Sequence, residues 1–100
     1  MAKLTFTPLA ESDLVEILDY IAQDKPLAAE QVIAEIRGTC ELLSNFPRLG
    51  RARQEIRESC RCMPVSRYVV YYNYSLSQDE VQIVRVVDGA RDIDEVYFPE

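Results

Sequence analysis

Arginines are the side chains of this chain best suited to chemistry, and most of them lie close together in the sequence. Six arginines occur within residues 48–67 against two acids, a balance of +4. Residues 1–47 carry three basic and eight acidic side chains, and residues 68–100 carry two and seven. Guanidinium groups bind carboxylates and phosphates through paired hydrogen bonds. The basic segment, residues 48–67, is therefore the candidate site for an acidic partner, DNA or RNA phosphates; solvated surface charge is the alternative.

Most catalytic and metal-binding constellations are excluded because the chain contains no histidine. A serine or cysteine nucleophile would lack its usual base. Cys60 and Cys62, without a histidine or a second cysteine pair, make a poor zinc site, and no glycine-rich phosphate loop is present. We therefore expect no metal and no cofactor. We expect Cys40, Cys60 and Cys62 to be reduced fillers rather than a disulfide framework.

Length and composition indicate a single domain over residues 1–100. The net charge of −6 argues against a general nucleic-acid binder, because such affinity comes largely from neutralising phosphates. No apolar run approaches the roughly eighteen residues of a membrane span. The N-terminus also lacks the apolar stretch of a signal peptide. These features predict a cytoplasmic protein.

Hydrophobic spacing predicts the helices that must position these side chains. Residues 3–7 alternate between apolar and polar types, as in a short strand with one buried face. Thr7-Pro8 is a typical helix start, with threonine at the N-cap and proline at the first helical position. A second helix is predicted from Pro26 to the residue before Pro47. The short connection at residues 23–25 should fold the two helices back as an antiparallel hairpin.

The second half of the chain predicts strands. Residues 68–74 are mostly β-branched or aromatic, the strongest strand signal in the sequence. Residues 56–63 form a weaker strand, residues 77–80 a turn, and residues 81–87 the last strand. Three strands joined by short links must be antiparallel neighbours. The predicted fold is α+β: an N-terminal strand, an antiparallel helix hairpin and a three-strand antiparallel meander, with the helices packed on one face of the sheet.

Four stretches, in this order and spacing, carry a resemblance to a known family. They are residues 10–14 (AESDL) leading to Ile17 and Tyr20-Ile21, Pro26 with Ala28-Ala29, residues 47–51 (PRLGR), and residues 67–72 (RYVVYY) followed by 83–92 (IVRVVDGARD). Over nearly its whole length the chain resembles the RelE/ParE toxins of bacterial type II toxin–antitoxin systems. The third stretch is similar to the P-x-x-G-R connection of the ParE branch, and the last to its R-V-x-H-G-x-R-D ending, with Asp88 where the family usually has histidine.

The resemblance implies two different activities. ParE toxins bind DNA gyrase and trap it with DNA cut, so a ParE-like chain is a protein inhibitor rather than an enzyme. RelE toxins cut mRNA on the ribosome with a basic cluster and a C-terminal tyrosine. By this resemblance Arg61, Arg91 and Tyr97 would remain of that set, whereas Ser59 and Tyr68 replace basic residues. We favour the gyrase inhibitor; the mRNA endoribonuclease and an inactive antitoxin-binding module are the alternatives.

The resemblance also implies partners: a ParD-like antitoxin in a hetero-oligomer, and gyrase, through which alone DNA is reached. Candidate gyrase contacts are Arg51, Arg53, Arg57, Arg61, Arg67 and Arg91. Candidate antitoxin contacts on the helix hairpin are Leu9, Val15, Leu18, Tyr20 and Ala22, for each of which core packing is the alternative. Arg85 lies in a strand flanked by valines, where we expect a structural ion pair with an acid such as Asp88 or Asp92.

Overall fold

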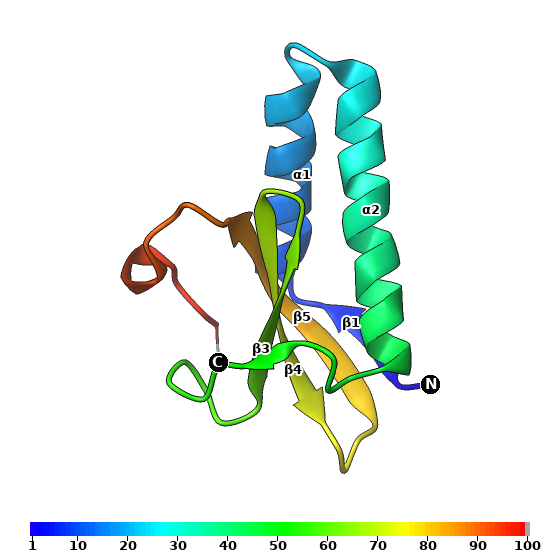
Figure 1. Cartoon of the computed structure of the whole chain (residues 1–100), viewed down its shortest axis with the longest axis vertical. Helices are drawn as coiled ribbons and strands as arrows, with labels where there is room; N and C mark the ends of the chain where they lie inside the picture. The colour runs from blue at the N-terminus through cyan, green and yellow to red at the C-terminus, as the bar shows by residue number, and fades with distance from the viewer. Residues whose placement is uncertain (100) are drawn as a thin grey trace.

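Two helices pack on one face of a five-stranded sheet in the computed structural model, which describes residues 1–99 (Figure 1). The elements in chain order are β1 (Lys3–Phe6), α1 (Pro8–Ala22), α2 (Pro26–Asn45), β2 (Arg51–Ala52), β3 (Cys60–Val65), β4 (Tyr68–Ser75), β5 (Glu80–Asp88) and a 3-10 helix (Ile93–Glu95). The predicted α+β architecture is confirmed. Neither helix within the described residues is long and apolar enough to cross a bilayer.

The sheet runs in the order β1-β5-β4-β3-β2 and is mixed. The predicted meander of β3, β4 and β5 is antiparallel, whereas β1 lies parallel to β5 at the other edge. The chain between these two parallel strands comprises the helix hairpin followed by β2, β3 and β4. Two details differ from the sequence expectation. The first meander strand begins at Cys60 and continues through Pro64, and the two-residue β2 covers only the part of its outer edge before Met63. Proline fits there because that edge needs no N–H donor.

Local signals explain the helix hairpin. The Thr7 hydroxyl accepts a hydrogen bond from the Ala10 N–H at 3.1 Å and so caps α1, while Pro8 takes the first helical position. Pro26 begins α2 after the short connection at residues 23–25, as predicted. In Figure 1 the closed end of the hairpin projects well beyond the sheet, so its outer turns have no strand beneath them.

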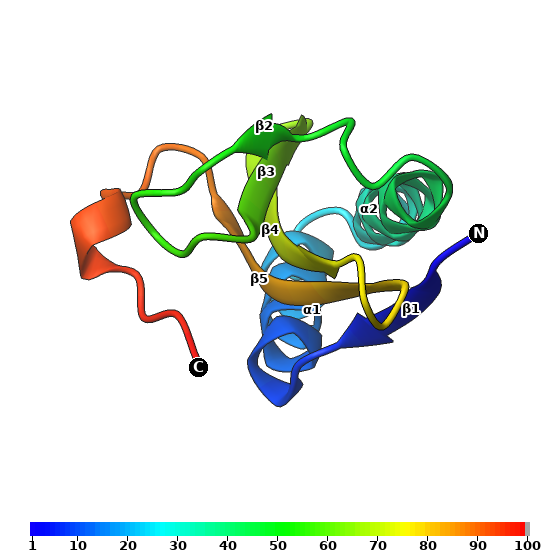
Figure 2. The same ribbon diagram turned by 90° about the horizontal axis from the view of Figure 1, so that it is seen from below.

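Each face of the sheet carries its own apolar cluster. The cluster under the helices is built around Leu14, Ile17, Ile36, Leu43, Val70, Tyr72, Val81, Ile83 and Val86. The opposite face holds Cys60, Cys62, Tyr71, Val84, Val87 and Val96, and the C-terminal segment lies on that side (Figure 2). A register shift between β4 and β5 sets Tyr71 opposite Arg85 but Tyr72 opposite Ile83. This bulge explains why Ile83 and Val86, three positions apart, share one face.

The three cysteines are buried and free, as predicted, with exposed fractions between 0% and 5%. Cys40 belongs to the helix-side cluster, and Cys60 and Cys62 share the opposite face. Among residues 1–99 no group of three or more cysteine, aspartate or glutamate side chains is arranged to hold a metal ion.

Burial of the Cys40 thiol gives a testable pH dependence. Burial raises the pKa of Cys40 from 9.0 to about 12, so the folded state keeps the thiol neutral where the unfolded chain ionises it. This contribution to stability is complete below the unfolded pKa and is lost as pH rises toward the folded pKa. Above pH 9 the unfolding free energy should fall by about 1.4 kcal/mol per pH unit through this group. Urea denaturation of wild type and Cys40→Ala between about pH 8 and about pH 10.5 tests this. The prediction is contradicted if the unfolding free energies of wild type and Cys40→Ala change with pH in parallel.

Candidate interaction surfaces

Arg85 forms a buried structural ion pair, but its partner is not the one expected. The Arg85 Nε and Nη2 atoms each donate to an oxygen of Asp13 on α1 at 2.8 Å, and both side chains are at most 10% exposed. A third Arg85 donor, Nη1, reaches the carbonyl of Tyr97 at 2.7 Å. The expected pairing with Asp88 or Asp92 is wrong. Arg85 instead ties α1, β5 and the C-terminal segment together.

Asp13 also completes the edge of β5. Strand β1 pairs with β5 only as far as Ile83, which leaves the following residues of that edge without a neighbouring strand. There the Thr7 hydroxyl donates to the Val84 carbonyl at 2.9 Å, and the Asp13 carboxylate accepts from the Val86 N–H at 2.9 Å. The side chains of the N-cap residue Thr7 and of Asp13 in α1 thus replace the missing strand, as buried backbone groups require.

Asp88 and Asp92 have separate roles in the turn after β5. The Ala90 N–H and the Arg67 guanidinium both donate to Asp88, and they lower the pKa of its carboxyl group. Asp92 accepts from the Asp94 N–H at 3.0 Å and so caps the 3-10 helix. The carboxylate at position 88, where the family usually has histidine, therefore pairs with Arg67 in the turn between β3 and β4.

Several arginines of the basic segment hold the chain's own structure. Arg53 pairs with Glu55 at 2.7 Å and lies 5.8 Å from the centre of the Tyr71 ring. Arg57 donates to the carbonyls of Phe98 and Pro99 at 2.8 and 3.1 Å. Together with the Arg67–Asp88 pair, these contacts attach the loop before β3 and the turn after β5 to neighbouring parts of the fold.

Arg51 and Arg91 differ from the other candidate gyrase contacts. Both are exposed, and the side chain of neither forms a hydrogen bond or an ion pair with another residue in the range 1–99. Arg51 lies on the edge strand β2, and Arg91 borders a hollow between α1 and the end of β5. They are the candidates whose charge remains most available to a partner.

Sequence reasoning missed the clamp that positions the loop between α2 and β2. The buried Tyr72 hydroxyl donates to the Pro47 carbonyl at 2.7 Å and accepts from the Gly50 N–H at 2.9 Å. Arg61 Nη1 donates to the Gly50 carbonyl at 2.7 Å and more weakly to that of Arg48. A Cβ atom at position 50 would lie 2.6 Å from the Tyr72 oxygen and 2.8 Å from the Cys62 carbonyl. The P-x-x-G spacing was the available signal, because it marks the two backbone groups that the tyrosine bridges.

Gly50→Ala is therefore expected to lower the unfolding free energy by about 2–3 kcal/mol, through overpacking and loss of the clamp. Tyr72→Phe, which leaves two buried backbone groups without their partner, should cost about 1–3 kcal/mol. Gly38→Ala is the matched control, because Gly38 lies exposed within α2 with nothing within 4 Å of the added Cβ. It should stabilise the protein by up to about 1 kcal/mol. If the Tm of Gly50→Ala is as high as that of Gly38→Ala, the contacts between Tyr72, Pro47 and Gly50 do not stabilise the fold.

The side chains implied for an mRNA endoribonuclease lie at three different places. Arg61 supports the loop carbonyls, Arg91 borders the α1–β5 hollow, and Tyr97 is 66% exposed in the C-terminal segment. Among the described residues no hydrogen bond, ion pair or ring contact joins any two of the three.

The candidate antitoxin contacts on α1 are unevenly exposed. Val15 and Tyr20 are 58% and 66% exposed, whereas Leu9, Leu18 and Ala22 are half-buried. Tyr20 also lines the α1–β5 hollow of about 260 Å³ together with Arg67 and Arg91. The structure therefore brings one candidate antitoxin contact beside two candidate gyrase contacts, so the two candidate surfaces adjoin there.

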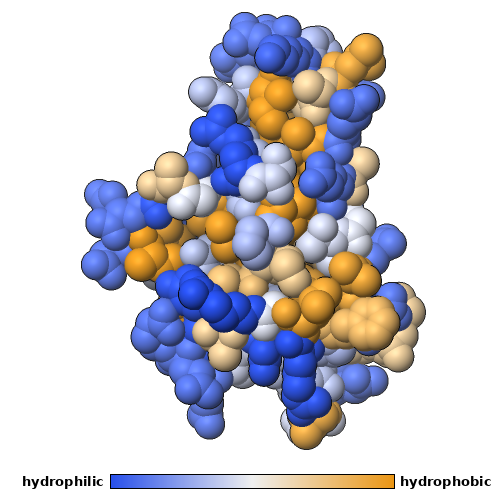
Figure 3. Space-filling view, viewed as in Figure 1, coloured by the Kyte–Doolittle hydropathy of each residue, from blue (hydrophilic) through white to orange (hydrophobic). Residues whose placement is uncertain are grey.

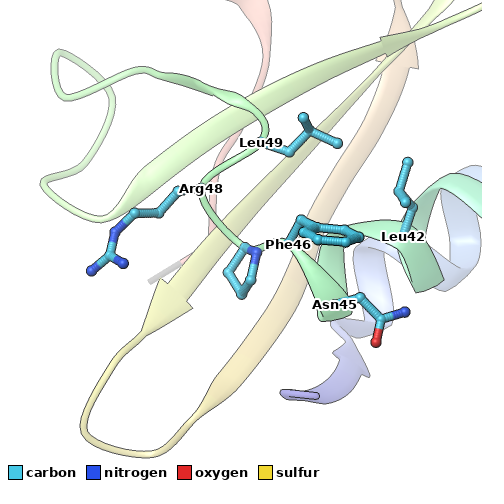
Figure 4. Close-up of a pocket in the computed structure, with 6 residues that line it drawn as sticks. Leu42, Asn45, Phe46, Arg48 and Leu49 are labelled. Carbon is cyan, nitrogen blue, oxygen red and sulfur yellow. The ribbon is translucent and has the colours of Figure 1, made fainter.

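An apolar surface at the end of α2 was also missed by sequence reasoning. Leu42, Phe46 and Leu49 are 43%, 60% and 51% exposed, and with Asn45, Pro47 and Arg48 they line an open hollow of about 670 Å³. Apolar surface gathers there at the lower right of Figure 3. In Figure 4 Phe46 lies between Leu42 and Leu49, while Arg48 points away from them. The helical spacing of residues 42 and 46, next to Pro47, was the available signal.

Comparison with known proteins places this geometry in a family. A sequence profile described as "ParE toxin of type II toxin-antitoxin system, parDE" matches residues 4–93. The chain is 35% identical over 92 residues to Toxin RelE2 of Caulobacter vibrioides, which covers 91% of this chain and 99% of that protein.

Two solved structures share the fold. The chromosomal ParDE TA system from P. aeruginosa matches with a TM-score of 0.74 and 21% identity, covering 88% of this chain and 96% of that one. The toxin–antitoxin complex RelBE2 from Mycobacterium tuberculosis matches with a TM-score of 0.65 and 22% identity, covering 87% and 96%. Because the profile spans 4–93 and the C. vibrioides relative aligns over almost its full length, the chain belongs to the ParE toxin family of type II toxin–antitoxin systems, within the RelE/ParE superfamily.

Proposed function

We propose that this toxin is a ParE-like poison of DNA gyrase that acts in the cytoplasm and is neutralised by a ParD-like antitoxin. The ParE family match over residues 4–93 is the observation that carries the proposal. The activity requires no chemistry from the toxin itself. It binds one intermediate of the gyrase cycle, with DNA cut, more tightly than the others and so raises its population.

Electrostatics supports Arg51 and Arg91 as the gyrase contacts. Guanidinium groups are common anchors in protein interfaces, and the guanidinium groups of these two arginines make no internal hydrogen bond or ion pair within residues 1–99. Arg53, Arg57, Arg61 and Arg67 act mainly by holding the loops on which the contact surface is built. DNA is reached through gyrase, because the chain's net charge of −6 repels phosphate elsewhere.

The ribosome-dependent mRNA endoribonuclease is the second candidate, favoured by the name of the C. vibrioides relative, Toxin RelE2. Cleavage of RNA at a 2′-hydroxyl needs a proton acceptor, a proton donor and positive charge converging on one phosphate. Arg61, Arg91 and Tyr97 make no contact with one another among the described residues, and Arg61 is engaged with two carbonyls. This arrangement favours the gyrase poison over the nuclease.

The antitoxin partner is proposed from the toxin–antitoxin systems that share the fold. The hairpin supplies exposed apolar side chains for it, Val15 and Tyr20 on α1. An antitoxin segment that orders on this face would bury them in a hetero-oligomer.

Two assays on the same purified toxin test the proposal. With relaxed plasmid, gyrase and ATP, we expect the toxin to inhibit supercoiling, and the antitoxin to restore it. With translating ribosomes, we expect primer extension to show no toxin-dependent cuts within codons. Codon-specific cuts together with unaffected supercoiling would replace the gyrase proposal by the endoribonuclease.

A further inference from the structure

Arg91 lies at the end of a tight turn after β5, and the last three backbone N–H groups of this turn all have acceptors. The Gly89 N–H donates to the Arg67 carbonyl at 2.8 Å, and the Arg91 N–H donates to the Asp88 carbonyl at 3.1 Å. Between them, the Ala90 N–H donates to the Asp88 carboxylate at 2.9 Å. A Cβ atom at position 89 would lie 3.0 Å from the Arg67 carbonyl oxygen, so the turn packs directly on the β3–β4 turn. The backbone of Arg91 is therefore fixed, although its guanidinium forms no hydrogen bond or ion pair with another described residue.

Asp88 divides its two carboxylate oxygens between two contacts. Its Oδ1 accepts from the Ala90 N–H, whereas its Oδ2 accepts from Nε and Nη2 of Arg67 at 3.1 and 2.5 Å. Two donors from one planar guanidinium restrict the orientation of the carboxylate and keep Oδ1 directed at Ala90. Arg67 is held in turn, because it is the second of the two residues that join β3 to β4, whose ends pair as Val65 and Tyr68. The Asp88 side chain thus connects the fixed β3–β4 hairpin to the turn after β5.

Stability alone is a weak reason for this ion pair. The side chains of Arg67 and Asp88 are 61% and 34% exposed, and an exposed ion pair contributes little to folding. The buried pair of Arg85 and Asp13 is the one that holds α1 on the sheet. Orientation is a stronger reason, because a side chain that is already presented in one direction loses less conformational freedom when a partner binds it. The exposed guanidinium next to this turn is that of Arg91.

We propose that Arg67 and Asp88 are positioning residues for Arg91: the Asp88 carboxylate, held by Arg67, fixes the turn after β5 so that the Arg91 guanidinium is presented to gyrase. The identity of the target rests on the proposed function, whereas the fixed turn does not. Arg67 and Asp88 act on inhibition only through Arg91, so their effect disappears when the guanidinium is removed. A direct contact of either residue with gyrase, or a general loss of stability, would not depend on the residue at position 91.

A double-mutant cycle of gyrase inhibition tests this dependence. Asp88→Ala should raise the toxin concentration for half-inhibition of supercoiling about fivefold, and Arg91→Ala about tenfold. The double variant should match Arg91→Ala within about twofold, since the turn then has no guanidinium to present. Arg67→Ala should show the same dependence on Arg91. Asp94→Ala is the matched control, because it removes the same charge from an exposed side chain that forms no hydrogen bond or ion pair with a described residue. It should leave half-inhibition within about twofold of wild type.

Amide hydrogen exchange measures the turn without gyrase. In Asp88→Ala the N–H groups of Ala90 and Arg91 should exchange at least about tenfold faster than in wild type, while the Tm stays within a few degrees. Unchanged exchange, or a loss of inhibition that is as large in the Arg91→Ala background as in wild type, overturns the proposal. If Asp88→Ala lowers the Tm further, the cycle of Arg67→Ala with Arg91→Ala decides by the same criterion. Wild-type toxin that leaves supercoiling unaffected contradicts the proposed function itself, and the exchange rates then report separately whether Asp88 fixes the turn.

Discussion

Replacement of Asp13 by alanine is expected to lower the unfolding free energy by about 3–5 kcal/mol, which is a large part of the stability of a domain of this size. The substitution leaves Arg85 buried with only the Tyr97 carbonyl as a partner, and it removes the acceptor of the Val86 N–H. A thermal melt should show a decrease in Tm of more than about 12 °C, since each kcal/mol corresponds to about 4–8 °C in a domain of up to about 100 residues.

A double variant with an apolar pair at positions 13 and 85 distinguishes two causes of lost stability, namely an unpaired buried charge and lost packing. Asp13→Leu combined with Arg85→Met removes both charges, and replacement of a buried ion pair by apolar side chains is often nearly neutral. We therefore expect the double variant to be more stable than Asp13→Ala, despite the Val86 N–H that both leave without its acceptor. If Asp13→Ala melts within a few degrees of wild type, the ion pair does not hold α1 against β5.

Reversal of the two available arginines is expected to weaken the toxin against gyrase without unfolding it. Arg51→Glu with Arg91→Glu should raise the concentration for half-inhibition of supercoiling at least about tenfold, because both positions change from attraction to repulsion of an acidic partner or DNA. The melt should stay close to wild type, since both side chains are exposed and make no internal ion pair within residues 1–99. The effect should shrink at high salt.

A charge-matched control removes net charge as the explanation. Lys3→Glu with Lys25→Glu changes the total charge by the same amount at exposed positions outside the basic segment. If the lysine control inhibits supercoiling as strongly as wild type while the arginine variant does not, the gyrase contact lies at Arg51 and Arg91. Arg53→Glu with Arg57→Glu is a poorer test, because both arginines also hold the fold. If the lysine control loses as much inhibition of supercoiling as the arginine variant, the effect of the arginines is one of net charge and not of a specific contact.

The helix hairpin and the antiparallel meander could be predicted because their signals are local. Thr7-Pro8 and Pro26 mark helix starts through capping and a fixed backbone angle, and short links force neighbouring strands to be antiparallel. The parallel pairing of β1 with β5 could not be predicted in the same way, because it joins residues more than seventy positions apart. The start of β3 was placed too early because Ile56 packs on the sheet from a turn.

The site residues were harder to predict for the same reason. Arg85 was assigned to acids near it in sequence, whereas its partner Asp13 lies 72 positions away. A usable signal was present: Asp13 lies on the apolar face of α1 with Leu14 and Ile17, and a buried carboxylate requires a cation. Sequence also treats all arginines alike. Only the structure separates Arg53, which pairs with Glu55, from the exposed Arg51.

Trapping of gyrase on cut DNA is the most direct test of the proposed function. Purified toxin, gyrase, ATP and negatively supercoiled plasmid are incubated, the reaction is stopped with detergent and protease, and linear plasmid is measured on a gel. Linear DNA should increase with toxin, be suppressed by the antitoxin, and be reduced when the toxin carries Arg51→Glu with Arg91→Glu. No linear DNA above the gyrase-only background, at toxin concentrations that still bind the antitoxin, would contradict it.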